Sequence, residues 1–122
     1  MRTSERAARL ISEMPAHDRP VSEEYRIVAK QWCQLDGAAR MLEECKTAVL
    51  SQMMKRMGNV PAAHAERDVK ASDEWTDYLT KMVEARTAAN EKKVQMKYIE
   101  MRFNERQSAD ASMRTEARLT RG

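Results

Sequence analysis

The side chains of this chain that could do chemistry are few and lie far apart in the sequence. Its two histidines, His17 and His64, both lie near prolines in predicted loops. No stretch has the spacing of a Cys-x-x-Cys, His-Glu-x-x-His or EF-hand metal site, and no glycine-rich phosphate loop occurs. Adjacent carboxylates such as Glu23 and Glu24 point in different directions on a helix, and their place suits a helix N-terminus. The sequence therefore predicts a protein that is not an enzyme, with no catalytic residue, metal, cofactor or small-molecule substrate.

Both cysteines, Cys33 and Cys45, fall within one predicted helix. Twelve residues of helix separate them by about 18 Å, whereas a disulfide needs Cα atoms within about 7 Å. We therefore expect free thiols that pack as small apolar groups. A disulfide between subunits is the alternative.

Basic residues near the C-terminus are the one group whose chemistry suits a charged partner. Residues 1–90 hold equal numbers of basic and acidic side chains, while residues 91–122 hold eight basic and five acidic ones. Arg114, Arg118 and Arg121 share one helical face, a spacing suited to phosphates. The alternative is a solvated face with ion pairs, because acidic residues are interleaved. The candidate DNA contacts are Lys92, Lys93, Lys97, Arg102, Arg106, Arg114, Arg118 and Arg121.

The composition predicts helices as the elements that carry these side chains. Charged residues make up 34% of the chain and aromatic residues 5%, with three glycines and three prolines. That mixture is typical of long helices and coiled coils. No apolar run is long enough to span a membrane, and the first residues lack the apolar core of a signal peptide. We therefore expect a cytoplasmic all-α protein.

The pattern of breakers and caps predicts one helical domain over residues 1–122. We expect a short helix over about 4–14, ended by Pro15, and a turn through Pro20. A long helix over about 22–57 then begins at Ser22 and ends at Gly58, where a glycine can cap it. A loop is predicted over 58–71. The alternatives for this loop are a disordered segment, a simple connection, a helical turn and a binding loop. A second long helix, capped by Ser72, is predicted over about 73–117.

Apolar residues of the two long helices predict a coiled-coil-like antiparallel hairpin. The first helix carries a heptad seam from Tyr25 to Met53, and the second a stripe from Trp75 to Phe103. Gly37 interrupts the seam, either as a tolerated glycine or at a close helix approach. The last helix carries a second apolar flank, so we expect a further element to pack on it, either the N-terminal helix or another subunit. We therefore expect a homo-oligomeric helical bundle, with candidate interface residues Met53, Met54, Met57, Val83, Val94 and Met101.

Parts of the last predicted helix resemble a group of phage proteins. These parts are the Ala89-Asn90 pair, the segment from Tyr98 to Phe103, and the closing Arg-x-Glu-Ala-Arg-Leu from Arg114 to Leu119. They are similar to the C-terminal region of small helical proteins encoded in bacteriophage early regions, often near genes for single-strand annealing or recombination proteins. The resemblance covers about a third of the chain. It implies a phage or prophage accessory protein that works in the host cytoplasm.

Two functions follow from these patterns. The first is a non-catalytic helical interaction protein that self-assembles and binds a protein partner. The alternative is a recombination or replication accessory factor that contacts DNA phosphates through its basic C-terminal helix.

Overall fold

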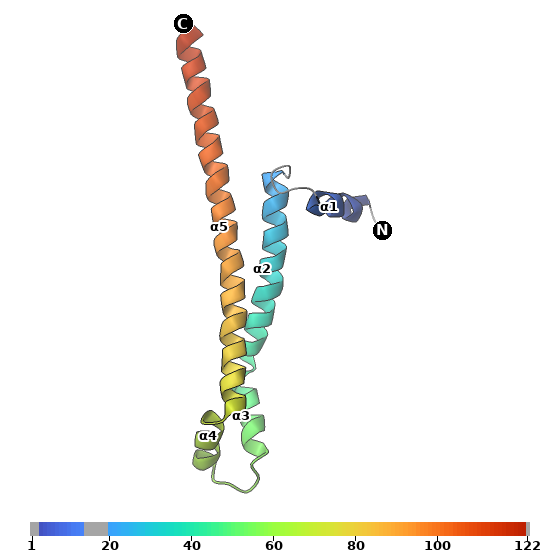
Figure 1. Ribbon diagram of the computed structural model, residues 1–122, viewed down its shortest axis with the longest axis vertical. Helices are drawn as coiled ribbons and strands as arrows, with labels where there is room; N and C mark the ends of the chain where they lie inside the picture. The colour runs from blue at the N-terminus through green and yellow to red at the C-terminus, as the bar shows by residue number, and fades with distance from the viewer. Residues whose placement is uncertain (1–2, 14–19, 122) are drawn as a thin grey trace. The chain divides into compact units, whose positions relative to one another are not determined.

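The computed structural model describes residues 3–13 and 20–121, and these residues form helices, turns and short connections without a strand (Figure 1). The all-α prediction is therefore confirmed for the described part of the chain. The helices are α1 (Thr3–Glu13), α2 (Val21–Glu44), α3 (Lys46–Lys55), α4 (Ala62–Lys70) and α5 (Asp73–Arg121). Met14 and residues 15–19 of the predicted turn lie outside the described residues.

The chain divides into two compact units, and each is described by itself below. Unit 1 comprises Met1–Gln31 and Lys92–Gly122, and unit 2 comprises Trp32–Glu91. Both α2 and α5 run through the two units. In each unit, α2 and α5 pack together as an antiparallel pair, because earlier residues of α2 contact later residues of α5. The long helix pair of the predicted hairpin is thus present, whereas the predicted single domain stays a prediction.

Helix α2 begins one residue earlier than the sequence suggested. The amides of Glu23 and Glu24 both donate to the carbonyl of Pro20 at 3.0 Å, so Pro20 precedes the first turn and Val21 opens it. Proline suits this position because the amides of a first helical turn lack partners within the helix.

The predicted helix over 22–57 is interrupted at Cys45, which corrects the expectation of one continuous helix. Cys45 has φ −83° and ψ −3°, whereas a regular helix has ψ near about −42°. The hydroxyl of Tyr78 donates to the carbonyl of Leu42, which is the acceptor that a regular helix offers to the amide of Lys46. A side chain that enters the helical hydrogen-bond ladder is a recognised cause of a helix break.

The segment predicted as a loop over 58–71 contains helix α4, so that prediction was wrong for most of its length. Pro61 precedes the helix, and its carbonyl accepts the amide of Ala65 at 3.0 Å. Ala65 and Val69, one turn apart, are both buried, and α4 packs against α3. This apolar pair supplies the tertiary contact that a helix of nine residues needs in water. Helix α3 ends at Lys55 with Arg56 as its C-cap, two residues before the predicted end, and Gly58, the predicted cap, follows with φ +78°.

Helix α5 begins as predicted and ends later than predicted. The amide of Trp75 donates to the hydroxyl of Ser72 at 3.3 Å, which confirms Ser72 as its N-cap. The helix continues to Arg121 rather than to residue 117, through 49 residues. No glycine or proline interrupts this range, and every residue from 101 to 121 is exposed.

The core of unit 2 gathers α3, α4 and the start of α5. Met53, Val69 and Trp75 are buried together, and the ring of Trp75 stacks on that of Tyr78 with centroids 5.6 Å apart. Ala39 and Ala89 have no exposed surface, which is typical of helices that approach closely. An added Cβ at Gly37 would meet nothing within 4 Å, so Gly37 is a tolerated glycine rather than a contact point.

The predicted seams coincide with the observed burial. All eight seam positions of the first predicted helix are buried or half-buried; they are Tyr25, Val28, Trp32, Leu35, Ala39, Leu42, Val49 and Met53. On α5 the stripe is buried or half-buried from Trp75 to Ile99, while Phe103 is exposed. The heptad interpretation therefore located the covered face of both helices.

Candidate interaction surfaces of helix α5

Arg86 fixes α5 against α2 in unit 2. Its guanidinium donates to both carboxylate oxygens of Glu43, at 2.6 and 3.1 Å, and to Asp36 at 2.7 Å. Hydrogen bonds from Arg86 lower the pKa of Glu43, and the bonds to Glu43 and Asp36 raise the pKa of Arg86. Two carboxylates two turns apart on α2 therefore set the register of the helix pair. Sequence reasoning missed this group, although the spacing of Asp36 and Glu43 on one helical face was a signal.

Two polar contacts flank the buried residues Val28 and Ile99 in unit 1. The hydroxyl of Tyr25 donates to Glu100 at 3.1 Å, and Arg102 lies 3.6 Å from Glu24. The hydrogen bond to Glu100 is the main cause of the raised pKa of Tyr25, with a smaller contribution from burial. These contacts orient α5, so that its opposite face points away from α2.

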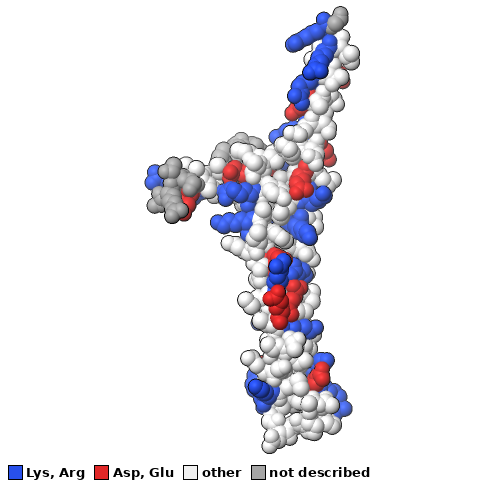
Figure 2. Space-filling model, turned by 180° about the vertical axis from the view of Figure 1, so that it is seen from behind, with Lys and Arg blue, Asp and Glu red and all other residues white. Residues whose placement is uncertain are grey.

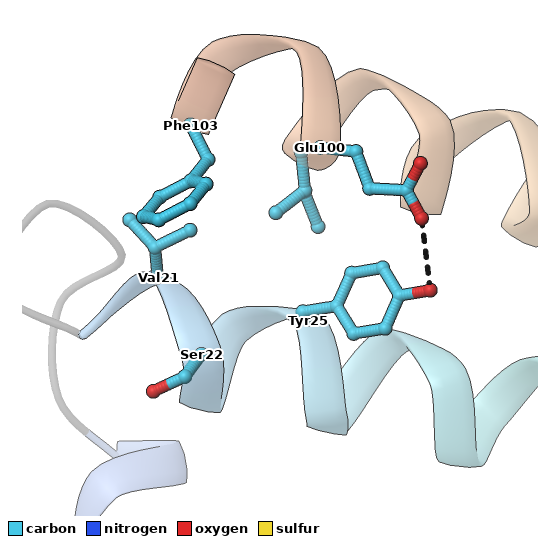
Figure 3. A pocket seen from close by; sticks show the side chains of 6 residues that line it. Val21, Ser22, Tyr25, Glu100 and Phe103 are labelled. Carbon is cyan, nitrogen blue, oxygen red and sulfur yellow. Dashed lines mark hydrogen bonds between the residues drawn. The ribbon is translucent and has the colours of Figure 1, made fainter. Parts of the chain in front are cut away.

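A mostly apolar cavity of about 330 Å³ opens between α2 and α5 in unit 1. Figure 3 shows Val21 and Phe103 facing each other across it, with the Tyr25–Glu100 hydrogen bond at one side. Ser22 and Ile99 complete its lining. The cavity walls hold no histidine, cysteine or lysine. Its chemistry suits an apolar group, and it offers no nucleophile paired with a base.

Val94, Tyr98 and Met101 form an exposed apolar surface on α5, which we call the α5 outer face. Their spacing of four and three residues places them on one side of the helix. Val94, Tyr98 and Met101 are 69%, 60% and 52% exposed. The guanidinium of Arg102 lies 5.8 Å from the centroid of the Tyr98 ring. Val83, in unit 2, is exposed to a similar degree.

The three methionines proposed at the hairpin tip have different environments. Met53 is 8% exposed and belongs to the core of unit 2, and Met54 is half-buried against that core. Met57 is exposed after the end of α3. Of these three candidate interface residues, Met57 alone presents an exposed side chain, because Met53 fills the space between α3 and α5.

The eight basic candidates do not form one surface. Lys92 is half-buried and Lys93 exposed; Lys97 lies 3.7 Å from Glu100, and Arg102 contacts Glu24 and Tyr98. Arg106 lines a small recess beside Phe103. Arg114 donates to the carbonyl of Asp110 at 3.4 Å, and Arg118 and Arg121 are exposed. Figure 2 shows Lys and Arg side chains gathered at the end of α5.

The described residues contain no group of three or more histidine, cysteine or acidic side chains that could hold a metal ion. The guanidinium of Arg67 lies 2.7 Å from Nδ1 of His64, and His17 lies outside the described range. Cys33 and Cys45 are both free thiols. Within the described ranges, every helix is too short or too polar to cross a bilayer.

Comparison of the chain with models of protein families, with curated proteins and with solved structures gives no match.

Proposed function

We propose that this chain is a non-catalytic helical interaction protein, a phage or prophage accessory factor that self-associates and binds a protein partner through α5. The α5 outer face is the observation that carries the proposal. Val94, Tyr98 and Met101 expose contiguous apolar surface on a helix whose other side is packed. Burying such surface stabilises a complex by roughly 25 cal/mol per Å², so covering this face favours the binding of a partner.

The free end of α5 supports the same proposal. Residues 104–121 are exposed on every side, so this segment lacks the tertiary packing that supplies most of the stability of helices in proteins. An extended helix with open surface is a common form of protein-binding element, because it presents side chains at fixed spacing.

Light scattering at micromolar concentration tests the proposal. The wild-type protein is expected to have a mass above that of one chain, and Val94→Lys with Met101→Lys should give a monomer with unchanged helix content. Met41→Lys is the matched control, because Met41 is similarly exposed but lies on α2. A wild-type protein that stays monomeric would remove self-association from the proposal.

DNA binding is the second candidate function, supported by the shared exposed face of Arg114, Arg118 and Arg121. Binding of labelled single-stranded and duplex DNA should weaken steeply as salt rises, because phosphate contacts release counterions. Replacing these three arginines by alanine should abolish binding. Replacing Lys46, Lys55 and Lys81 removes the same charge elsewhere and should leave most of it. Absence of affinity at low salt would eliminate this candidate.

A further inference from the structure

The cavity between α2 and α5 has the size and the lining of a small ligand site. Its volume of about 330 Å³ lies at the lower end of the range of about 300–1,000 Å³ for small-molecule pockets. An apolar cavity of about 150 Å³ holds benzene, so this one has room for a longer hydrocarbon group. Every residue that lines the cavity belongs to unit 1. Its walls therefore lie within one compact unit.

The acidic groups near the cavity already have partners within the chain. Glu100 accepts the hydroxyl of Tyr25 at 3.1 Å (Figure 3), and the ammonium of Lys97 lies 3.7 Å from the same carboxylate. Glu24, one residue before Tyr25, lies 3.6 Å from Arg102. A cationic ligand would therefore compete with these contacts.

A basic group without a partner lies at the edge of the cavity. Arg102 and Arg106, one turn apart on α5, line a small recess. Arg106 is exposed and takes part in no ion pair or hydrogen bond of the described residues, and Asp110, one turn further on, does not pair with it. Its guanidinium can therefore bind an anionic group without losing a contact within the chain. The recess and the cavity share three apolar residues, which are Val21, Ile99 and Phe103.

We propose that this site binds a small amphiphilic anion, an apolar chain that ends in a carboxylate, of the class of medium-chain fatty acids. The chain lies between Val21 and Phe103, which face each other across the cavity (Figure 3), and the carboxylate pairs with Arg106. The chain favours binding because its surface leaves water. The ion pair selects the sign of the head group.

The shape of the site favours a free acid over a segment of polypeptide. An extended peptide pairs with a strand edge, and a helical peptide needs a groove with apolar anchors at successive turns. The described residues of unit 1 contain no strand. On α5, the residues three and seven positions after Phe103 are Arg106 and Asp110, so the apolar surface ends after one turn. The cavity therefore accommodates one short apolar group.

Titration of the ¹⁵N-labelled protein with octanoate, followed by NMR, tests the site. Octanoate should saturate one site per chain and shift the amides of Val21, Tyr25 and Phe103 more than those around Met53 in the core of unit 2. Octyltrimethylammonium has the same chain and a positive head group, and should bind at least about fivefold more weakly. Equal affinity for the two ions would overturn the choice of an anion. Shifts spread evenly over the chain, or no saturation, would overturn the cavity as the site.

Variants that fill the cavity test the position of the chain. Val21→Trp occupies the space beside Phe103, so the affinity for octanoate should fall at least about tenfold. Ser22→Trp, from an exposed position on the same wall, is the second variant and should also weaken binding. Circular dichroism checks that helix content is unchanged. Unaltered affinity in either folded variant would contradict binding in this cavity.

A charge variant tests the position of the carboxylate. Arg106→Gln should weaken octanoate binding about threefold, as expected for an exposed ion pair, and should leave the binding of octan-1-ol unchanged. Arg118→Gln is the matched control, because it removes the same charge about 18 Å further along α5. Equal weakening of octanoate by both variants would show a general effect of charge and overturn the assigned role of Arg106.

Discussion

Gly37 lies in the middle of α2 on an exposed position where a methyl group would touch no neighbour. Glycine in a helix interior costs about 0.5–1 kcal/mol relative to alanine. Gly37→Ala should therefore raise the free energy of unfolding by about that amount in a denaturant titration. Gly58→Ala is the control, because its φ of +78° disfavours any other residue and the substitution should destabilise the protein. No gain from Gly37→Ala would mean that this position has a contact on an unseen partner.

The Glu43 carboxylate gives part of the protein's stability a dependence on pH. Its pKa is lowered by the hydrogen bonds from Arg86, so its contribution is present above its unfolded pKa and lost as pH falls through the folded value. Glu43→Gln should therefore be less stable than wild type at neutral pH, with a difference that shrinks below about pH 4. Glu44→Gln, on the neighbouring exposed residue, is the control and should leave the free energy of unfolding close to that of the wild type. A difference that is equal at pH 3 and pH 7 would contradict this role of Glu43.

At the scale of elements, the last part of α5 differs from the part that packs on α2. Residues 104–121 have helical backbone and no covering side chains, whereas Ile99 is buried. In dilute, monomeric protein the amides of 104–121 should exchange with solvent at least about tenfold faster than those around Ile99, because unsupported helices open readily. Amide exchange read by mass spectrometry checks this. Equal protection of both segments in the monomer would show that the end of α5 is stable by itself.

Sequence patterns predicted the elements wherever local chemistry decides them. Ser72 caps α5, Gly58 follows α3, and the seam from Tyr25 to Met53 is covered. The interruption at Cys45 could not be predicted, because Tyr78, whose hydroxyl reaches Leu42, is 36 residues away. Helix α4 was missed for a related reason: its polar sequence favours a loop until Ala65 and Val69 find an apolar surface on α3.

The candidate surface was predicted in part. Val83, Val94 and Met101 belong to the second apolar flank that the sequence predicts on α5, and all three are exposed. Met53 was selected for its density of neighbouring methionines, which cannot distinguish an interface from a core. The contact of Arg86 with Asp36 and Glu43 could not be predicted from the sequence, because the arginine and the two carboxylates come from different helices.

At the scale of the whole molecule, the two units offer different surfaces to a partner. Unit 2 closes its core around Trp75, Met53 and Val69. Unit 1 instead opens an apolar cavity beside Phe103 and leaves the α5 outer face uncovered. The proposed contacts with other molecules therefore concentrate in unit 1, while unit 2 contributes a packed helical core.

The oxidation rates of the methionines on these surfaces measure how far each surface is covered. Exposed thioethers oxidise to sulfoxides readily, whereas buried ones are protected. Met41 on α2 and Met113 near the end of α5 are 64% and 67% exposed. Met101 lies on the α5 outer face, and Met53 is buried. Brief peroxide treatment followed by peptide mass spectrometry should therefore oxidise Met41 and Met113 first and Met53 last. The rate at Met101 then reports how much of the α5 outer face is occupied under the chosen conditions, without any substitution in the chain.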